Sequence, residues 1–293
     1  METDGLIVVD KPAGMTSHDV VARIRRLAKT RRVGHGGTLD PMATGVLIIG
    51  VNRATRLLTY VIGAGKSYAA TIRLGQSTIT DDAEGDVTAQ ANASTVTDEA
   101  ITAGLRAQTG EIQQAPSAVS AIKIKGERAY KRVREGEAVE LPPRTVTISR
   151  LDILDIRRAD AVVDVDIDVA CSSGTYIRAI ARDLGATLGV GGHLTALRRT
   201  AVGSMTLAEA STLDTLETRA PDVITLPMAD AARRAFPERI ATEDETRIMR
   251  HGGRLTAVGI TGPYAVFSPD GLLLAIVSEK SGQARAEIVL APA

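Results

Sequence analysis

Apolar residues recur along this chain in patterns that predict strands. Two continuous apolar runs, at residues 6–9 and 46–49, are typical of strands. Strict alternation of apolar and polar residues predicts two more strands, over 67–74 and 163–169. The last of these has one apolar and one acidic face, as expected for a strand of an antiparallel sheet that is exposed on one side.

Helical spacing of apolar residues occurs between these strands. It predicts helices over residues 17–28, 97–108 and 176–188, and Ser17 is placed to cap the first of them. Helices and strands follow one another in mixed order, without regular βαβ alternation. The sequence therefore predicts an α+β fold built on a mixed, largely antiparallel sheet.

The character of the sequence changes near residues 233–237. Beyond this point a short helix is predicted over 244–250, followed by strands around 264–267 and 272–277 that a Ser-Pro-Asp-Gly turn connects. We therefore expect a catalytic or binding domain over residues 1–232 and a small β-rich domain over 233–293. A β-rich domain that serves RNA binding and one that serves only packing both remain open.

Composition narrows the class of protein. Of the 293 residues, 44% are hydrophobic, which supports a core, but no apolar run reaches the ~18 residues that span a bilayer. No secretory signal is visible, and the single cysteine, Cys171, cannot form an internal disulfide. The four histidines are scattered without metal-ligand spacing. These features predict a cytoplasmic protein with no membrane segment and no metal.

Charge is segregated, although the net charge is zero. Six basic residues and no acid lie between Arg23 and Arg32, and a second basic group lies between Lys123 and Arg134. Such clusters on a neutral protein predict a local basic track for phosphates. The alternative is two helix faces that are simply solvated.

The stretch from Val33 to Gly45 places a single carboxylate, Asp40, between a glycine-rich turn and Pro41. Glycines allow positive φ and a close approach of the backbone to a ligand, and proline stiffens the chain after the acid. A carboxylate held on a stiff loop before a buried strand is typical of a nucleophile or an acid/base group. An Asx-type turn that only reverses the chain is the alternative.

The same stretch resembles the catalytic motif of the bacterial tRNA pseudouridine synthase B family, in which the aspartate after Gly-Thr-Leu is catalytic. Four further segments resemble the family's motifs in the family's order, at residues 10–17, 66–68, 174–178 and 192–200. The C-terminal β-rich segment resembles the PUA domain, an RNA-binding appendage of RNA-modifying enzymes. The resemblance implies a catalytic domain of the pseudouridine-synthase type followed by a PUA-like domain.

The resemblance implies roles for particular residues. Asp40, Tyr68 and Arg178 would be catalytic. Arg178 would keep Asp40 ionised, because a paired arginine typically lowers a carboxyl pKa by ~1–3 units, and Tyr68 would stack on the base and transfer a proton. Substrate binding would involve seven further residues: Lys11, His35, Tyr176, Leu197, Arg199, Lys123 and Lys131.

Within this set, Lys11 would support the pocket, Leu197 would form its apolar floor, and His35 would occupy the space that the flipped nucleotide leaves. Lys123 and Lys131 belong to an RNA-gripping loop expected over about residues 113–145, whose basic residues would contact phosphates. One departure from the family pattern is Gly36, which stands where threonine or serine is common and which is expected to loosen the catalytic loop.

By resemblance, the protein isomerises the uridine at position 55 in the T-arm of tRNA to pseudouridine, as a monomer without a cofactor. Asp40 would act at the glycosidic bond, either by covalent attack or by stabilising a charged sugar. A non-catalytic protein that binds or folds tRNA on the same fold is the main alternative. An aspartyl-phosphate enzyme is disfavoured, because such enzymes commonly have a second aspartate two residues after the first, where Met42 stands here.

Overall fold

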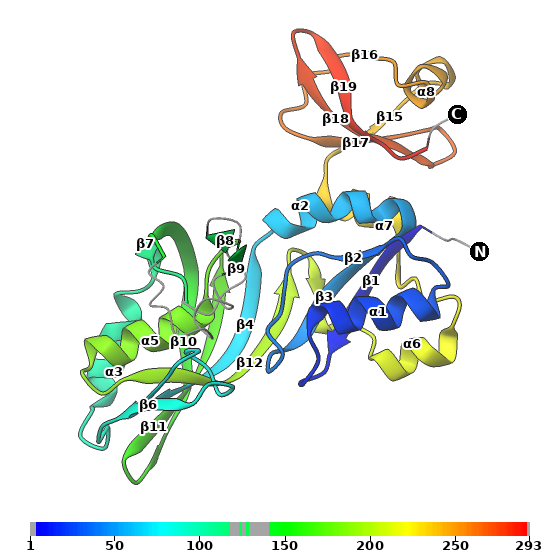
Figure 1. Cartoon of the computed structure of the whole chain (residues 1–293). Helices are drawn as coiled ribbons and strands as arrows, with labels where there is room; N and C mark the ends of the chain where they lie inside the picture. Colours follow the sequence, from blue (N-terminus) through cyan, green and yellow to red (C-terminus); the bar gives the residue numbers. More distant parts are fainter. Residues whose placement is uncertain (1–3, 118–122, 125–126, 129–140, 292–293) are drawn as a thin grey trace.

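The computed structural model describes residues 4–117, 123–124, 127–128 and 141–291 of the chain. In this part of the chain, a large mixed sheet with helices packed on it is followed by a smaller sheet at the C-terminus (Figure 1). The predicted α+β class is confirmed.

The larger sheet is largely antiparallel, as predicted. Among its described neighbours, only β3 and β12 run parallel. In order across the sheet, its strands are β14 (Leu226–Pro227), β1 (Gly5–Lys11), β3 (Thr44–Val51), β12 (Gly192–Val202), β4 (Lys66–Leu74), β11 (Val162–Cys171), β10 (Arg144–Ala159) and β7 (Gly110–Gln114). In addition, β2 (Val33–His35) pairs with β3, and β13 (Met205–Thr206) pairs with β12.

Helices cover this sheet on both faces. One face shares an apolar cluster with four helices: α1 (Ser17–Leu27), α3 (Asp98–Arg106), α5 (Ile177–Thr187) and α6 (Leu213–Arg219). Against the other face of β1 and β3 pack the 3₁₀ helix η1 (Asn52–Leu57), α2 (Leu58–Gly63) and α7 (Met228–Ala235). Because both faces are covered, β1 and β3 are continuous apolar runs rather than alternating ones.

Strand β11 shows the opposite pattern. Its valines and isoleucine face the apolar cluster, and its aspartates face outward, where they form ion pairs such as the two-pronged contact of Arg73 with Asp164 at 2.7 and 2.8 Å. The predicted half-exposed strand is confirmed.

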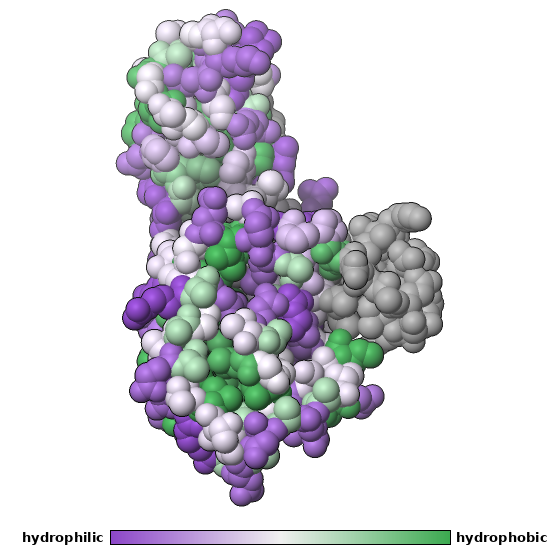
Figure 2. Space-filling model, turned by 90° about the vertical axis from the view of Figure 1, so that its left-hand side faces the viewer, coloured by the Kyte–Doolittle hydropathy of each residue, from purple (hydrophilic) through white to green (hydrophobic). Residues whose placement is uncertain are grey.

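The smaller sheet has the order β15 (Glu238–Ile240), β17 (Tyr264–Phe267), β18 (Leu273–Lys280), β19 (Gln283–Val289) and β16 (Leu255–Thr256), and α8 (Glu243–Arg250) packs on it. The predicted hairpin is the antiparallel pair β17 and β18. This sheet forms a lobe above the larger unit, and apolar residues on the face shown gather in small patches between polar ones (Figure 2). The expected boundary between residues 232 and 233 falls inside α7 and stays a prediction.

Short elements complete the described chain. They are the two-stranded pairs β5 (Gln76–Thr78) with β6 (Val87–Gln90) and β8 (Lys123–Ile124) with β9 (Glu127–Arg128), and the 3₁₀ helix η2 (Leu207–Glu209). No helix among the described residues combines the length and the apolar character needed to cross a bilayer.

The start of α1 differs from the prediction. Thr16, not Ser17, is the N-cap, and it forms a capping box with Asp19. Ser17 is buried, and its hydroxyl bonds the backbone of Leu39, next to Asp40. Two adjacent hydroxyl residues both fit the capping pattern, and the contact with Leu39 decides which of them is used.

Candidate active site

Asp40 lies on the loop between β2 and β3, and two glycines shape this loop. Gly37 and Gly45 have φ of +101° and +98°, the region that favours glycine. At Gly45 a Cβ atom would lie 2.2 Å from the carbonyl oxygen of Arg199, so only glycine fits this strand crossing. Gly36 has no positive φ; there a Cβ atom would lie 3.1 Å from Val61 of α2. Glycine at this position therefore lets α2 pack closely against the loop.

Lys11 holds the loop from the end of β1. Its side chain is completely buried, and its ammonium group donates to the carbonyl oxygens of Pro12 (2.9 Å), Met15 (2.6 Å) and Pro41 (3.2 Å). Burial lowers the pKa of Lys11. The bond to Pro41 ties β1 to the residue that follows Asp40, which accords with the supporting role expected for Lys11.

Ser17 and Arg199 hold the residues before Asp40. Ser17 Oγ donates to the Leu39 carbonyl (3.1 Å) and accepts from the Leu39 N–H (2.9 Å). The buried guanidinium of Arg199 donates to the carbonyls of Val46 (2.7 Å), Gly37 (3.1 Å) and Thr38 (3.3 Å). Arg199 therefore orders the loop backbone, in addition to lining the pocket.

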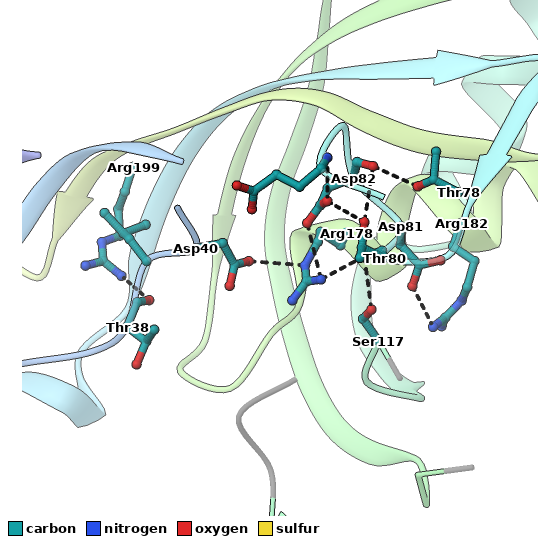
Figure 3. Close-up of polar contacts among 12 residues, drawn as sticks. Thr38, Asp40, Thr78, Thr80, Asp81, Asp82, Ser117, Arg178, Arg182 and Arg199 are labelled. Carbon is teal, nitrogen blue, oxygen red and sulfur yellow. Dashed lines mark hydrogen bonds and ion pairs between the residues drawn. The ribbon is translucent and has the colours of Figure 1, made fainter. Parts of the chain in front are cut away.

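The Asp40 carboxylate points at Arg178 at the start of α5 (Figure 3). Arg178 Nε lies 3.1 Å from Asp40 Oδ2, and Arg178 Nη1 lies 3.3 Å from Asp82 Oδ2. Nη1 also donates to the carbonyl of Thr80 at 2.7 Å. The Arg178 side chain is 7% exposed and that of Asp40 is 35% exposed, so the arginine is fixed from behind while the carboxylate stays accessible.

The pKa of Asp40 is raised overall, although the arginine acts in the expected direction. Burial is the largest cause of the rise, and Asp82 adds to it. Lys11 and Arg199 also favour the ionised form. Although the Asp40 side chain is 35% exposed, the protein atoms packed around the carboxylate desolvate it more than the nearby cations stabilise its ionised form.

Asp40 opens into a pocket of about 270 Å³. Five of the predicted site residues line it together with Asp40: Tyr68, Tyr176, Arg178, Leu197 and Arg199. Burial raises the pKa of Tyr68, so its phenol keeps its proton and can donate a hydrogen bond. Lys66 and Ile62 complete the wall near α2. One carboxylate, two aromatic rings and an apolar floor thus surround this space.

Lys11 and His35 do not line the pocket. His35 is on β2 next to α1, with its ring 5.3 Å from that of His18, and it is not among the pocket-lining residues. Burial lowers the pKa of His35, which favours the neutral ring. Lys123 belongs to strand β8, and Lys131 lies outside the described residues.

Sequence reasoning missed Asp82 and Gln114. Both are buried polar residues; Asp82 binds Arg178, and Gln114 binds the backbone of Tyr176. Two adjacent acids, at 81 and 82, follow β5. This pair was the feature of the sequence that could have indicated a contact with a basic residue, because a carboxylate that becomes buried requires a partner. In the part of the chain that the structure describes, no three His, Cys, Asp or Glu side chains are grouped to hold a metal ion.

Comparisons with known proteins agree with this arrangement. A family model described as "TruB family pseudouridylate synthase (N terminal domain)" matches residues 25–177. Residues 178–222 match "tRNA pseudouridylate synthase B C-terminal domain" and residues 236–291 match "tRNA Pseudouridine synthase II, C terminal". The chain therefore belongs to the TruB family of pseudouridine synthases, as its motifs predicted.

Relatives match nearly the whole chain. "tRNA pseudouridine synthase B" of Arthrobacter sp. (strain FB24) is 57% identical, over 98% of this chain and 97% of its own length. The protein of the same name from Thermobifida fusca (strain YX) is 55% identical, over 98% of this chain and 99% of its own length.

Solved structures share the fold. The chain in "Crystal structure of the archaeal box H/ACA sRNP Nop10-Cbf5 complex" is 27% identical, with a TM-score of 0.72 over 99% of this chain and 87% of that chain. The chain in "Crystal Structure of a Cbf5-Nop10-Gar1 Complex" is 26% identical, with a TM-score of 0.73 over 99% of this chain and 86% of that chain. The expected pseudouridine-synthase fold with a PUA-like C-terminal domain is confirmed.

Proposed function

We propose that this chain converts the uridine at position 55 in the T-arm of tRNA to pseudouridine, and that Asp40 initiates the reaction. Membership of the TruB family makes the chain a tRNA pseudouridine synthase. The observation that supports Asp40 most strongly is its position. Its carboxylate is held by Arg178 at 3.1 Å and faces a pocket lined by Tyr68 and Leu197.

The target base enters this pocket by flipping out of the folded RNA. Tyr68 offers an aromatic face for stacking, and Leu197 offers the apolar floor. His35, beside the loop, takes the space near the vacated position. Asp40 then acts at C1′ of the ribose, where the bond to N1 of uracil breaks and the base leaves with the electron pair.

The uracil rotates and C5 forms the new bond to C1′. C5 then loses its proton and N1 gains one, so the reaction is balanced in electrons and protons and requires no cofactor. Asp40 must be ionised to act at C1′. Burial opposes that state, whereas Arg178, Lys11 and Arg199 favour it. The neutral phenol of Tyr68 relays protons between the base and its surroundings.

RNA binding involves positive charge around the pocket. The basic cluster between Arg23 and Arg32 occupies α1 and the loop before β2. Lys123 and Lys131 belong to the loop expected over 113–145. These residues contact phosphates and supply affinity that falls with salt. Tyr176 contacts the flipped nucleotide. In this proposal the protein works as a cytoplasmic monomer.

The test is release of tritium from a tRNA transcript that carries 5-³H-uridine, without added cofactor. We expect release from the full transcript and none from one that lacks the T-loop uridine. Asp40→Asn keeps the shape of the side chain but cannot ionise, so it should abolish release while tRNA binding persists.

Asp244→Asn is the matched control, since this carboxylate is 81% exposed on α8 and should leave the rate unchanged. Continued release by Asp40→Asn would exclude Asp40 as the initiating residue. Tight tRNA binding by the natural chain with no release would instead favour the non-catalytic alternative.

A further inference from the structure

Gln114 forms an unusual contact at the end of β7. The residue is 2% exposed. Its Oε1 accepts a hydrogen bond from the backbone N–H of Tyr176 (2.8 Å), and its Nε2 donates to the backbone carbonyl of Tyr176 (3.1 Å). One side-chain amide thus satisfies both backbone groups of one residue, as a neighbouring strand would.

The residue held in this way directly precedes α5. Tyr176 is the N-cap of that helix, in an extended conformation (φ −103°, ψ 108°), and its own side chain makes no capping bond. It also lines the pocket. Arg178 follows two residues later and contacts Asp40 at 3.1 Å. The Tyr176 backbone therefore lies directly before the helical turn that carries Arg178.

The residues after Gln114 form separate contacts with α5 and with the turn that carries Asp82. Arg182, one turn beyond Arg178, donates to the carbonyls of Ala115 (2.8 Å) and Pro116 (3.4 Å). Ser117 donates to the Thr80 carbonyl (3.3 Å), which also accepts from Arg178 (Figure 3). Residues 114–117 are thus bound between the start of α5 and the turn that carries Asp82.

We propose that Gln114 is a positioning residue for catalysis: its amide fixes the backbone of Tyr176 and thereby aims Arg178 at Asp40. This inference rests on the proposed roles of Asp40 and Arg178. Removing the amide leaves a buried N–H and a buried C=O without their partner, so the segment must shift to find others. A misplacement of about 1 Å is enough to lower a rate by about a hundredfold.

The experiment compares Gln114→Met with Gln113→Met. Methionine matches the length of glutamine and removes both hydrogen bonds. Gln113 is the exposed neighbour on the same strand, and its amide bonds only Thr145 Oγ1 (2.8 Å) among the described contacts. We measure the single-turnover rate of tritium release at saturating enzyme, the tRNA Kd and the melting temperature.

We expect Gln114→Met to lower the saturating rate about tenfold or more and to change the Kd for tRNA much less, because phosphate contacts supply most of the affinity. Gln113→Met should leave both unchanged. The pH profile distinguishes a misplaced Arg178 from a general loss of folded structure. A misaimed Arg178 favours ionised Asp40 less, so the acid limb of kcat/KM should move to higher pH in Gln114→Met. An equal loss at every pH, or rates equal to those of Gln113→Met, would overturn the inference.

If Gln114→Met does not fold, Gln114→Asn replaces it. Asparagine keeps a neutral amide but is one methylene shorter, so it cannot reach both backbone groups of Tyr176 in the same way, and the same upward shift of the acid limb is expected. An unshifted limb in this variant contradicts the proposal. Absence of release by the natural chain would count against the proposed function itself, whereas an active natural chain with unaffected Gln114 variants would refute only this inference.

Discussion

At the scale of single residues, burial and the nearby cations have opposite effects on the ionisation of Asp40. Three cationic side chains, Lys11, Arg178 and Arg199, are buried around Asp40. Lys11 and Arg199 bond backbone carbonyls, and the charge of each favours the ionised form of Asp40. Burying a charge is costly unless it is hydrogen-bonded, and the loop supplies those bonds. The same residues thus order the loop and favour its ionised carboxylate.

The raised pKa of Asp40 predicts how activity depends on pH. The reaction needs the ionised carboxylate, so kcat/KM should fall as the pH drops, with a midpoint above the ordinary value of 3.8. Arg178→Met removes the largest effect that lowers this pKa, and the acid limb should move to higher pH. Arg178→Lys keeps a positive charge and should move it less. A wild-type midpoint below 3.8 would contradict the assignment.

At the scale of elements, the start of α1 serves two separate purposes. Thr16 caps the helix through its capping box with Asp19, whereas Ser17, one residue on, points into the protein and bonds both backbone groups of Leu39. Helix geometry turns successive residues by about 100°. Neighbouring hydroxyl groups can therefore stabilise the helix and the catalytic loop independently.

This division predicts different effects for two alanine variants. Thr16→Ala should reduce the free energy of unfolding by about 1 kcal/mol and leave the saturating rate nearly unchanged. Ser17→Ala leaves the buried N–H and C=O of Leu39 without this partner, so it should cost about 1–3 kcal/mol and also lower the rate. Denaturant unfolding and single-turnover assays measure both quantities. Equal rate losses in the two variants would show that the loop does not depend on Ser17.

At the scale of the whole molecule, the two sheets share part of their core. Leu273 of β18 packs in the same cluster as Leu6 and Val8 of β1, whereas the adjacent Leu274 packs in the separate core of the smaller sheet. Polar contacts reinforce the junction, including Tyr60 of α2 with Glu287 of β19 at 2.6 Å. Since α2 also packs on Gly36, the C-terminal sheet supports the far side of the catalytic loop.

Two neighbouring leucines test this arrangement. Leu273→Ala and Leu274→Ala each delete a buried side chain and should each cost about 2–5 kcal/mol. Hydrogen exchange followed by mass spectrometry should separate them. Leu273→Ala should accelerate exchange in β1 and β3 as well as in β18, and Leu274→Ala only in the C-terminal sheet. The same exchange pattern in both variants would mean that the two units do not stabilise each other through this cluster.

Local patterns in the sequence were sufficient to predict these helices and strands. The apolar runs of β1 and β3, the alternation of β11 and the spacing in α1, α3 and α5 all predicted the correct type of structure. The reason is that these periods follow from backbone geometry within a few residues. The Asp40 motif was equally visible, because its glycines and proline are required by the path of one short loop.

Long-range packing decided the rest. Asp82 reaches Arg178, and Gln114 reaches Tyr176, across large separations in the chain, and no local period marks such partners. The choice between Thr16 and Ser17 as the cap depended on Leu39, far along the chain. The direction of the Asp40 pKa shift depended on everything that encloses the loop. The sequence by itself determined which elements form and which residues we propose for the chemistry. Only the tertiary structure decided how these residues are buried, paired and aimed, because desolvation depends on all surrounding elements at once.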